Sequence, residues 1–452
     1  MATKYKTPFK DRDAQLFIFS KHPFYLFLFL VTWFLLLFYC LPAKKTATLR
    51  ISGSDDQKLT TASRRCTAGA LVYVYELPEK FNAGLLEDCR NLSVYTDMCP
   101  HVANRGLGQP VPEMGSPSWY ATHQFIAEMI FHARAENHPC RTWDPQEAAL
   151  FYVPFYGGLH ASSKFREPDL QARDALAVQL VEYLSQQPAW QRNQGADHFL
   201  ALGRTAWDFM RSEDGVDFGA NRLLRLPRVL NMSVLTVERH PWEGSNQHGI
   251  PYASYFHPST LDEMVTWQER MRSSPRPFLF SFVAGPRKGV DKAAVRDVIF
   301  RHCAESTQCH HVKCSPGAPE CHEPNRVLGV LSRSIFCMQP PGDSFTRRSV
   351  FDSVLAGCIP VFFSPHTAYT QYEWYLPSDH EEYSVYIAEE KAGQIEEELL
   401  KIPADKVERM RATVIDLIPR LTYAHPNTTD AWLLDAVDVA LERLAKHVRS
   451  RF

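Results

Sequence analysis

The feature that most constrains the fold is the stretch 334–363, with the sequence SIFCMQPPGDSFTRRSVFDSVLAGCIPVFF. Residues 334–339 form a short apolar run of strand length that ends at two prolines. Residues 342–344 supply a turn and a helix N-cap, and apolar residues spaced four apart follow them. Gly357 can end this helix, and residues 359–363 have the composition of a second buried strand. The order predicts half of a doubly wound α/β domain.

Polar side chains gather at the first turn of this expected helix, where Ser344, Thr346, Arg347 and Arg348 occur together. Free N–H groups and the helix dipole favour an anion at this end of a helix. Arginine forks match phosphate oxygens with two parallel hydrogen bonds. Asp352 follows Arg348 by one turn, within reach of a ribose hydroxyl if a nucleotide binds here. An Arg348–Asp352 ion pair on the surface is the alternative interpretation, and the pattern alone leaves both open.

Residues 340–344, 346–349, 351–352 and 356–361 together resemble the signature of exostosin-like glycosyltransferase family 47, in its plant xyloglucan galactosyltransferase branch. A thinner similarity extends from about Tyr73 to Trp432. The resemblance implies a GT-B-like α/β fold, in which two Rossmann-like domains face an interdomain cleft. It also implies an inverting enzyme that makes a β-linkage from an α-linked nucleotide sugar by one in-line displacement.

The size and charge of the chain fit this organisation. With 452 residues, 45% apolar and 22% charged, the chain can form two globular domains. The net charge of −2 gives no reason to expect nucleic acid as a partner. Residues 24–41 are uncharged and strongly apolar, and at ~1.5 Å per residue they span a thin bilayer core of ~27 Å. We expect a cytosolic tail (1–23), a transmembrane signal anchor (24–41), a lumenal stem (42–66), an acceptor-side domain (67–275) and a nucleotide-sugar-binding domain (276–452).

The cysteines and glycosylation sequons favour a lumenal body. Ten of the eleven cysteines follow the expected anchor, and so do the sequons at Asn91, Asn231 and Asn427. No small-residue cleavage site follows the apolar run, which predicts an anchor that is not cleaved. We therefore expect a single-pass type II protein of the Golgi membrane, with possible complexes with other Golgi glycosyltransferases.

The cysteine pattern admits two interpretations. Cys89 and Cys99 bracket a short loop and predict a local disulfide. Four more cysteines lie within residues 303–321, together with histidines that would suit a zinc site. Their spacing lacks a C-x-x-C pair, and an oxidising lumen favours disulfides. Disulfides are the favoured interpretation for this cluster, with the pairing left open.

A second candidate phosphate-binding element is the glycine-bounded loop 284–289, which follows an expected strand. The family resemblance then implies a donor site in the second domain that stabilises developing charge on the diphosphate. The resemblance also implies a UDP-sugar as the donor substrate. No convincing Asp-x-Asp metal motif is present, so we expect no metal and no other cofactor. The expected donor-binding residues are Arg287, Lys288, Ser344, Thr346, Arg347, Arg348 and Asp352.

An inverting transfer needs one base for the proton of the acceptor hydroxyl, supplied from the opposite domain. Asp197 and His198 open an expected strand, and the carboxylate can orient the imidazole, so we favour this pair. The other candidates are His123, Glu128 and Glu243. His123 falls in an expected helix over 119–135, where a hydrogen-bonded core histidine is the alternative.

The loop 240–258 is rich in aromatic residues, glycine and proline and shows no periodicity. Such loops at an interdomain crevice commonly bind sugars, whereas a plain linker is the alternative. Relatives generally carry Pro-Thr where this chain has Ala253-Ser254, so the hydroxyl is kept but the rigid proline is lost.

Together these features predict an inverting transferase that moves a sugar, most simply galactose, from a UDP-sugar onto xylosyl side chains of xyloglucan. A donor such as UDP-galacturonic acid or a UDP-pentose, acting on xyloglucan or another wall glycan, is the first alternative. A non-catalytic lumenal carbohydrate-binding subunit and a zinc-dependent lumenal enzyme are the others. The presence of Arg347, Arg348 and Asp352 favours an active enzyme.

Overall fold

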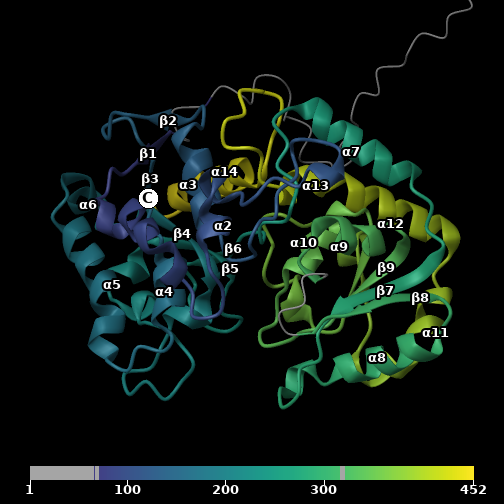
Figure 1. Ribbon diagram of the computed structural model, residues 1–452. Helices are drawn as coiled ribbons and strands as arrows, with labels where there is room; N and C mark the ends of the chain where they lie inside the picture. The colour runs from purple at the N-terminus through teal and green to yellow at the C-terminus, as the bar shows by residue number, and fades with distance from the viewer. Residues whose placement is uncertain (1–65, 67–70, 316–320) are drawn as a thin grey trace, which may run out of the picture. The chain divides into compact units, whose positions relative to one another are not determined.

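The computed structural model describes Cys66, residues 71–315 and residues 321–452. The expected tail, the anchor and the stem up to Arg65 lie outside these residues. None of the helices in the described part has the length and apolar character needed to cross a membrane. The described residues belong to one compact unit, built on two sheets (Figure 1).

The first sheet has six parallel strands in the order β2-β1-β3-β4-β5-β6. Strands β3 and β5 are buried at every residue, as expected for parallel strands that are covered on both faces. Because all strands run the same way, their carboxyl ends meet at one edge. The bounds are β1 (Val72–Val74), β2 (Arg141–Thr142), β3 (Leu150–Val153), β4 (His198–Thr205), β5 (Ser233–Glu238) and β6 (Gln247–Gly249).

Helices cover both faces of this sheet. One face of β3 and β4 packs with α3, and the other packs with α4, α5 and α6. The sheet and these helices are called the first lobe below. The helix bounds are α2 (Cys99–Val102), α3 (Ala127–Glu136), α4 (Gly157–Lys164), α5 (Leu170–Ser185) and α6 (Pro188–Asn193).

The helix expected over 119–135 begins only at Ala127, so its first two turns were predicted wrongly. Trp119 instead forms an antiparallel bridge with Phe256, and Tyr120 forms one with Pro110. The apolar residues before Ala127 pack against a loop of the chain and not along a helix face. Apolar content without a helical period misled the prediction here.

The second sheet has five parallel strands in the order β11-β10-β9-β7-β8. Helices α8 and α11 lie on one side of it and α9, α10 and α12 on the other (Figure 1). This sheet and its helices are called the second lobe. The strand bounds are β7 (Phe278–Ala284), β8 (Cys309–Lys313), β9 (Ser334–Gln339), β10 (Ile359–Phe362) and β11 (Val385–Tyr386). The helix bounds are α7 (Leu261–Ser273), α8 (Val295–Glu305), α9 (Pro324–Leu331), α10 (Arg348–Leu355), α11 (Ile395–Leu400), α12 (Ala404–Asp416) and α13 (Ile418–Leu421).

The stretch 334–363 folds as predicted. Strand β9 is followed by a turn, by α10 and by β10, and β9 and β10 pair in parallel. Gly357 has φ of 61°, a left-handed conformation that suits glycine, directly after the helix. The two parallel sheets confirm the α/β class.

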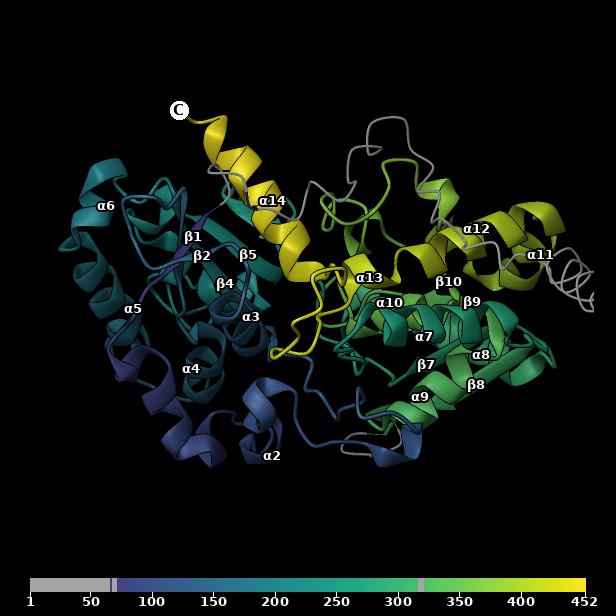
Figure 2. The same ribbon diagram turned by 90° about the horizontal axis from the view of Figure 1, so that it is seen from above.

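The last helix, α14 (Ala436–Arg449), returns to the first lobe and packs against α3 and β3 (Figures 1 and 2). Arg134 Nε of α3 donates to Asp435 Oδ2 at 2.7 Å, and His138 Nε2 lies 3.0 Å from Asp438 Oδ1. We expected all of 276–452 in the second domain, whereas this helix packs on α3 and β3 of the first lobe.

Five disulfides pair every cysteine that the structure describes. The Cys89–Cys99 bond confirms the predicted local disulfide. The 303–321 cluster forms two disulfides, so its sulfurs are not thiolate ligands for zinc. The five pairs are Cys66–Cys140, Cys89–Cys99, Cys303–Cys309, Cys314–Cys321 and Cys337–Cys358.

Candidate functional site

A cavity of about 870 Å³ is lined by residues of both lobes. Strands β4, β7 and β9 end at it, with Thr205, Ala284 and Gln339 in its lining, and Cys314 follows β8 there. Ligands bind at the carboxyl ends of strands in open parallel sheets. The cavity therefore lies at the carboxyl ends of strands from both sheets, where parallel sheets bind ligands.

The second lobe lines this cavity with cations. Six of the seven expected donor-binding residues are in the lining, and Lys288 is not. Sequence reasoning missed Lys292 and Arg296, which also line the cavity. Arg296 donates to the backbone oxygens of Pro341 at 2.7 Å and Gly285 at 2.8 Å, so it joins the two expected phosphate loops. The six expected residues found in the lining are Arg287, Ser344, Thr346, Arg347, Arg348 and Asp352.

Arg347, at the N-cap of α10, has hydrogen-bonding capacity to spare. Its Nη1 donates to the Thr346 carbonyl at 2.9 Å, but its Nη2 is buried and has no partner in the described chain. Burial lowers the pKa of this guanidinium, and the nearby Asp343 opposes the shift in part. Gly342 packs directly against the guanidinium, and a Cβ there would collide with it. An anion in the cavity would satisfy the free donor.

Arg348 and Asp352, in contrast, are engaged by the protein. Arg348 Nη1 donates to the Thr122 carbonyl at 3.0 Å, its Nη2 bonds the Tyr255 hydroxyl, and its Nε lies 3.4 Å from Asp352 Oδ2. Ser254 Oγ donates to Asp352 Oδ1 at 2.6 Å. Burial raises the pKa of the Asp352 carboxyl, and Arg348 opposes this rise. The pair is a buried bridge from α10 to the loops of the first lobe, so the surface ion-pair interpretation was wrong.

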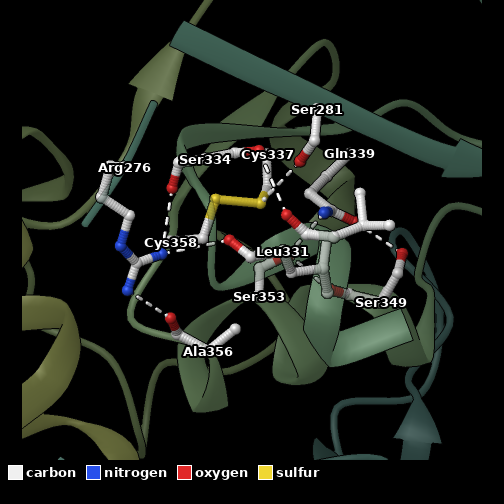
Figure 3. Close-up of a disulfide and its surroundings, with 11 residues drawn as sticks. Arg276, Ser281, Leu331, Ser334, Cys337, Gln339, Ser349, Ser353, Ala356 and Cys358 are labelled. Atoms are coloured by element: carbon white, nitrogen blue, oxygen red, sulfur yellow. Dashed lines mark hydrogen bonds between the residues drawn. A yellow bond between two sulfur atoms is a disulfide. The ribbon is translucent and has the colours of Figure 1, made fainter. Parts of the chain in front are cut away.

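A disulfide joins β9 to the residue before β10 (Figure 3). Cys337 and Cys358 are fully buried and enclose the whole turn and helix between them. Gln339 Nε2 donates to Ser353 Oγ at 2.6 Å, and Ser349 Oγ donates to Gln339 Oε1 at 2.6 Å. These bonds fix α10 on the end of β9, so the cationic helix start has a rigid support.

Glu238, the last residue of β5, is a site residue that sequence reasoning missed. It is fully buried and accepts from Thr346 N at 2.7 Å, Thr346 Oγ1 at 2.5 Å and Trp207 Nε1 at 2.7 Å. A carboxylate of the first lobe therefore holds the residue before Arg347. The available signal was an acidic residue at the end of a mostly apolar strand, where burial requires a specific partner.

The favoured base pair lies away from the cavity. His198 is the first residue of β4, at the amino edge of the sheet, and it is fully buried. Its Nδ1 lies 2.7 Å from Asp197 Oδ1, as expected, but its Nε2 meets the Tyr75 hydroxyl at 2.8 Å. Its ring stacks on Phe151. The pair therefore lies at the amino edge of the sheet, whereas the cavity lies at the carboxyl edge.

Two further candidates also have structural partners. Glu128 is fully buried and accepts from the N–H groups of Gly158, Leu159 and Gly203 at 2.8 to 3.0 Å. Burial raises its pKa to about 7, and the three backbone donors oppose this rise. Glu243 is half exposed and pairs with Arg225 at 3.0 Å. Neither lines the cavity.

His123 does line the cavity. Burial lowers its pKa to about 3, so the ring is neutral at physiological pH. Its Nδ1 accepts from Phe125 N at 3.2 Å, which places the ring proton on Nε2. His123 can therefore donate a hydrogen bond from Nε2 to a ligand. Because Nε2 already carries the proton in this tautomer, it cannot accept a proton from the ligand.

Asp208 is the one carboxylate of the first lobe in the cavity lining, among the residues that the structure describes. Its Oδ2 accepts from Arg204 Nε at 2.8 Å and from Thr205 Oγ1 at 3.1 Å. Its Oδ1 makes no hydrogen bond within the described chain. Sequence reasoning did not select it, since an acidic residue between two aromatics gives no distinctive signal.

A family model described as the Exostosin GT47 domain matches residues 66–402. The chain belongs to this glycosyltransferase family. The match covers the first lobe, the cationic loops and α10, and it ends before α12.

Curated relatives from Arabidopsis thaliana extend over most of the chain. The probable xyloglucan galactosyltransferase GT17 is 64% identical over 85% of this chain and 84% of its own. Xyloglucan galactosyltransferase MUR3 is 44% identical over 84% of this chain and 62% of its own. Xyloglucan-specific galacturonosyltransferase 1 is 38% identical over 84% of this chain and 57% of its own. Among solved structures, Anabaena Alr3699/HepE in complex with UDP-glucose matches with a TM-score of 0.34 and 9% identity, over 84% of this chain and 99% of its own.

Proposed function

We propose that this GT47 member is an inverting transferase that moves galactose from UDP-galactose onto xylosyl side chains of xyloglucan. The observation that carries the proposal is the cavity at the carboxyl edges of both sheets, with an unpartnered arginine donor on one side. The 64% identity to a probable xyloglucan galactosyltransferase supports the choice of donor and acceptor. The arrangement of two parallel sheets around one cavity supports a GT-B-like architecture.

The second lobe would bind the donor diphosphate. Arg347 offers its free Nη2, and Arg287, Lys292 and Arg296 also line the cavity. We propose that these cations, with the start of α10, stabilise the leaving diphosphate without a metal ion. Activity that survives a chelator at saturating donor would support this, and activity that returns only when a divalent cation is added back would contradict it.

Asp208 is the base that we propose for the acceptor hydroxyl. It lines the cavity from the first lobe and keeps Oδ1 free while Arg204 and Thr205 hold Oδ2. Replacing it by asparagine keeps the size but removes the proton acceptor. We expect Asp208→Asn to lower kcat by about 10²–10⁴-fold and to leave UDP affinity unchanged. An unchanged kcat would remove Asp208 from this role.

The donor sugar is tested with a panel. Relatives at 38 to 64% identity include both galactosyl- and galacturonosyltransferases by name, so identity alone does not choose the sugar. Incubating the protein with xyloglucan oligosaccharides and UDP-galactose, UDP-galacturonic acid or a UDP-pentose distinguishes them by product mass. We expect a hexose addition from UDP-galactose. If only another donor gives a product, that donor replaces UDP-galactose in the proposal. If no donor gives a product, a non-catalytic carbohydrate-binding subunit is favoured.

We further propose a single-pass type II protein of the Golgi membrane with a lumenal body. Five disulfides fit an oxidising compartment, and Asn91, Asn231 and Asn427 are all exposed. The expressed protein should stay with membranes and lose mass on treatment with a glycan-removing enzyme. A soluble product without glycans would contradict this topology. Complexes with other Golgi glycosyltransferases remain part of the proposal, tested by co-purification.

A further inference from the structure

Three aromatic side chains from separate segments meet at the mouth of the cavity. Tyr95 comes from the loop before α2, Phe165 follows α4, and Phe218 comes from the loop after β4. Their ring centroids are 6.4 Å apart between Tyr95 and Phe165 and 5.5 Å apart between Phe165 and Phe218. These three residues are called the aromatic shelf.

Two of the three shelf residues are both exposed and part of the cavity lining. Tyr95 is 63% exposed and Phe218 is 73% exposed, yet both line the cavity. Large apolar side chains are seldom left this exposed in a cluster unless a ligand or partner covers them. Two such side chains in one cavity lining therefore form a surface that suits contact with a ligand.

Ordered contacts hold the shelf in place. Arg204 lies over Phe165 at 4.8 Å and over Phe125 inside the cavity at 4.3 Å, which connects the shelf with the cavity wall. Val94 N donates to the Ser162 carbonyl at 3.3 Å and fixes the Tyr95 loop on α4. The Phe218 loop is held by Asp217, which accepts from Ser212 N at 2.7 Å.

We propose that the aromatic shelf binds the neutral glucan backbone of the polysaccharide acceptor. Pyranose rings carry apolar C–H faces and polar edges, which suits flat aromatic side chains beside polar groups. The shelf belongs to the first lobe, on the side opposite the cationic donor site. A polymer whose side chain reacts inside the cavity must continue outward, and the shelf is continuous with that exit. This inference rests on the proposed function for the identity of the acceptor.

The test measures binding of xyloglucan oligosaccharides to the full-length protein by calorimetry, without donor. We expect Tyr95→Ala and Phe218→Ala each to raise the oligosaccharide Kd by about tenfold, the equivalent of ~1.4 kcal/mol, with UDP affinity unchanged. Tyr95→Phe should bind like the parent, because the ring face makes the contact. Trp143→Ala is the matched control, since Trp143 is 69% exposed and does not line the cavity.

Several results would overturn the shelf as an acceptor site. One is an unchanged oligosaccharide Kd in the Tyr95→Ala/Phe218→Ala double variant, and another is an equal loss in Trp143→Ala. A changed sedimentation mass in the double variant with unchanged oligosaccharide binding would assign the shelf to a protein partner instead. The proposed function has a separate test. If the parent protein binds the oligosaccharide through the shelf but transfers no sugar to it, the shelf proposal holds and the proposed transferase activity is wrong.

Discussion

The two lobes share one scaffold but offer different chemistry at the carboxyl ends of their strands. The second lobe presents arginines and a lysine, of which Arg347 has an unused donor. The first lobe presents aromatic rings, a neutral histidine and the half-free carboxylate of Asp208. In the proposed function, the loops that follow the strands suit this edge to a diphosphate in the second lobe and to a sugar hydroxyl in the first.

A second difference separates residues that bridge the lobes from residues that face the ligand. Glu238 and Arg348 bond to partners on the other side of the contact between the lobes. Arg347 and Asp208 keep capacity for a ligand. Adjacent residues such as Arg347 and Arg348 can therefore have different roles, and mutations can separate stability from binding.

The largest effect is expected for Arg348→Ala. It removes the cation that pairs with the buried Asp352 and leaves that carboxylate without its counter-charge. Loss of one partner of a buried pair costs about 3–5 kcal/mol, so the melting temperature should fall sharply in thermal unfolding. Arg409→Ala is the matched control, because Arg409 pairs with Asp405 at the same four-residue spacing but both are 69% exposed. If both variants lose the same stability, Arg348 is not a bridge between lobes.

A smaller effect, on binding and not on folding, is expected for Arg347→Ala. A charge-assisted hydrogen bond contributes about 1.5–3 kcal/mol, so UDP affinity should fall by about ten- to 150-fold in calorimetry. Arg347→Lys should rescue only part, because a point charge lacks the fork. Arg287→Ala is the comparison within the site: its side chain is 43% exposed and pairs with Asp343, so we expect a weaker loss. Parental UDP binding in Arg347→Ala would place the nucleotide elsewhere.

The lobes should also differ in their response to acid. Burial lowers the pKa of five histidines to about 4 or below, and all lie within residues 123–257: His123, His132, His160, His248 and His257. Between pH 6.5 and 4 these five histidines become protonated in the unfolded chain but stay neutral in the folded protein. Stability therefore falls as pH falls through this window.

The contribution of one of these histidines can be isolated. His160 is buried, and its pKa is lowered to about 4. His160→Asn should flatten the dependence of unfolding free energy on pH by up to about 1.4 kcal/mol per pH unit below pH 6.5. Denaturant titrations at pH 7.0, about 6 and about 5 measure this slope. If the variant has the same slope of unfolding free energy against pH as the parent, the pKa of His160 is not lowered in the folded protein.

The smallest effect is expected for His198→Gln on turnover. The imidazole lies at the amino edge of β4, so kcat per folded molecule should stay within about twofold of the parent, whatever the loss of stability. A base contributes about 10²–10⁴-fold. A fall of that size with UDP affinity retained would restore the Asp197–His198 pair as the base and reverse the assignment of Asp208.

A structural feature could be predicted from the sequence when its signals lie close together in the chain. The unit from β9 to β10 was predictable because its strand, turn and helix signals all lie within thirty residues. The position of His198 was not, since it depends on which edge of a sheet the start of β4 occupies. Glu238 and Asp208 act through partners more than thirty residues away or through a cavity that no local pattern marks. Sequence patterns identified most of the cations that the second lobe brings to the site. They did not show which of these cations already bond to other groups of the protein.

The return of α14 to the first lobe has a consequence for synthesis on the ribosome. The strands of the first lobe are translated before the second lobe, but the α3 face of the first lobe is covered by α14, which is translated after the second lobe. Until then Arg134 has no Asp435 to pair with, and the apolar residues of α3 and β3 beneath α14 have no cover. The nascent first lobe therefore keeps this surface exposed to chaperones until α14 has been translated. A premature stop anywhere before Asp435 would leave that surface open for good.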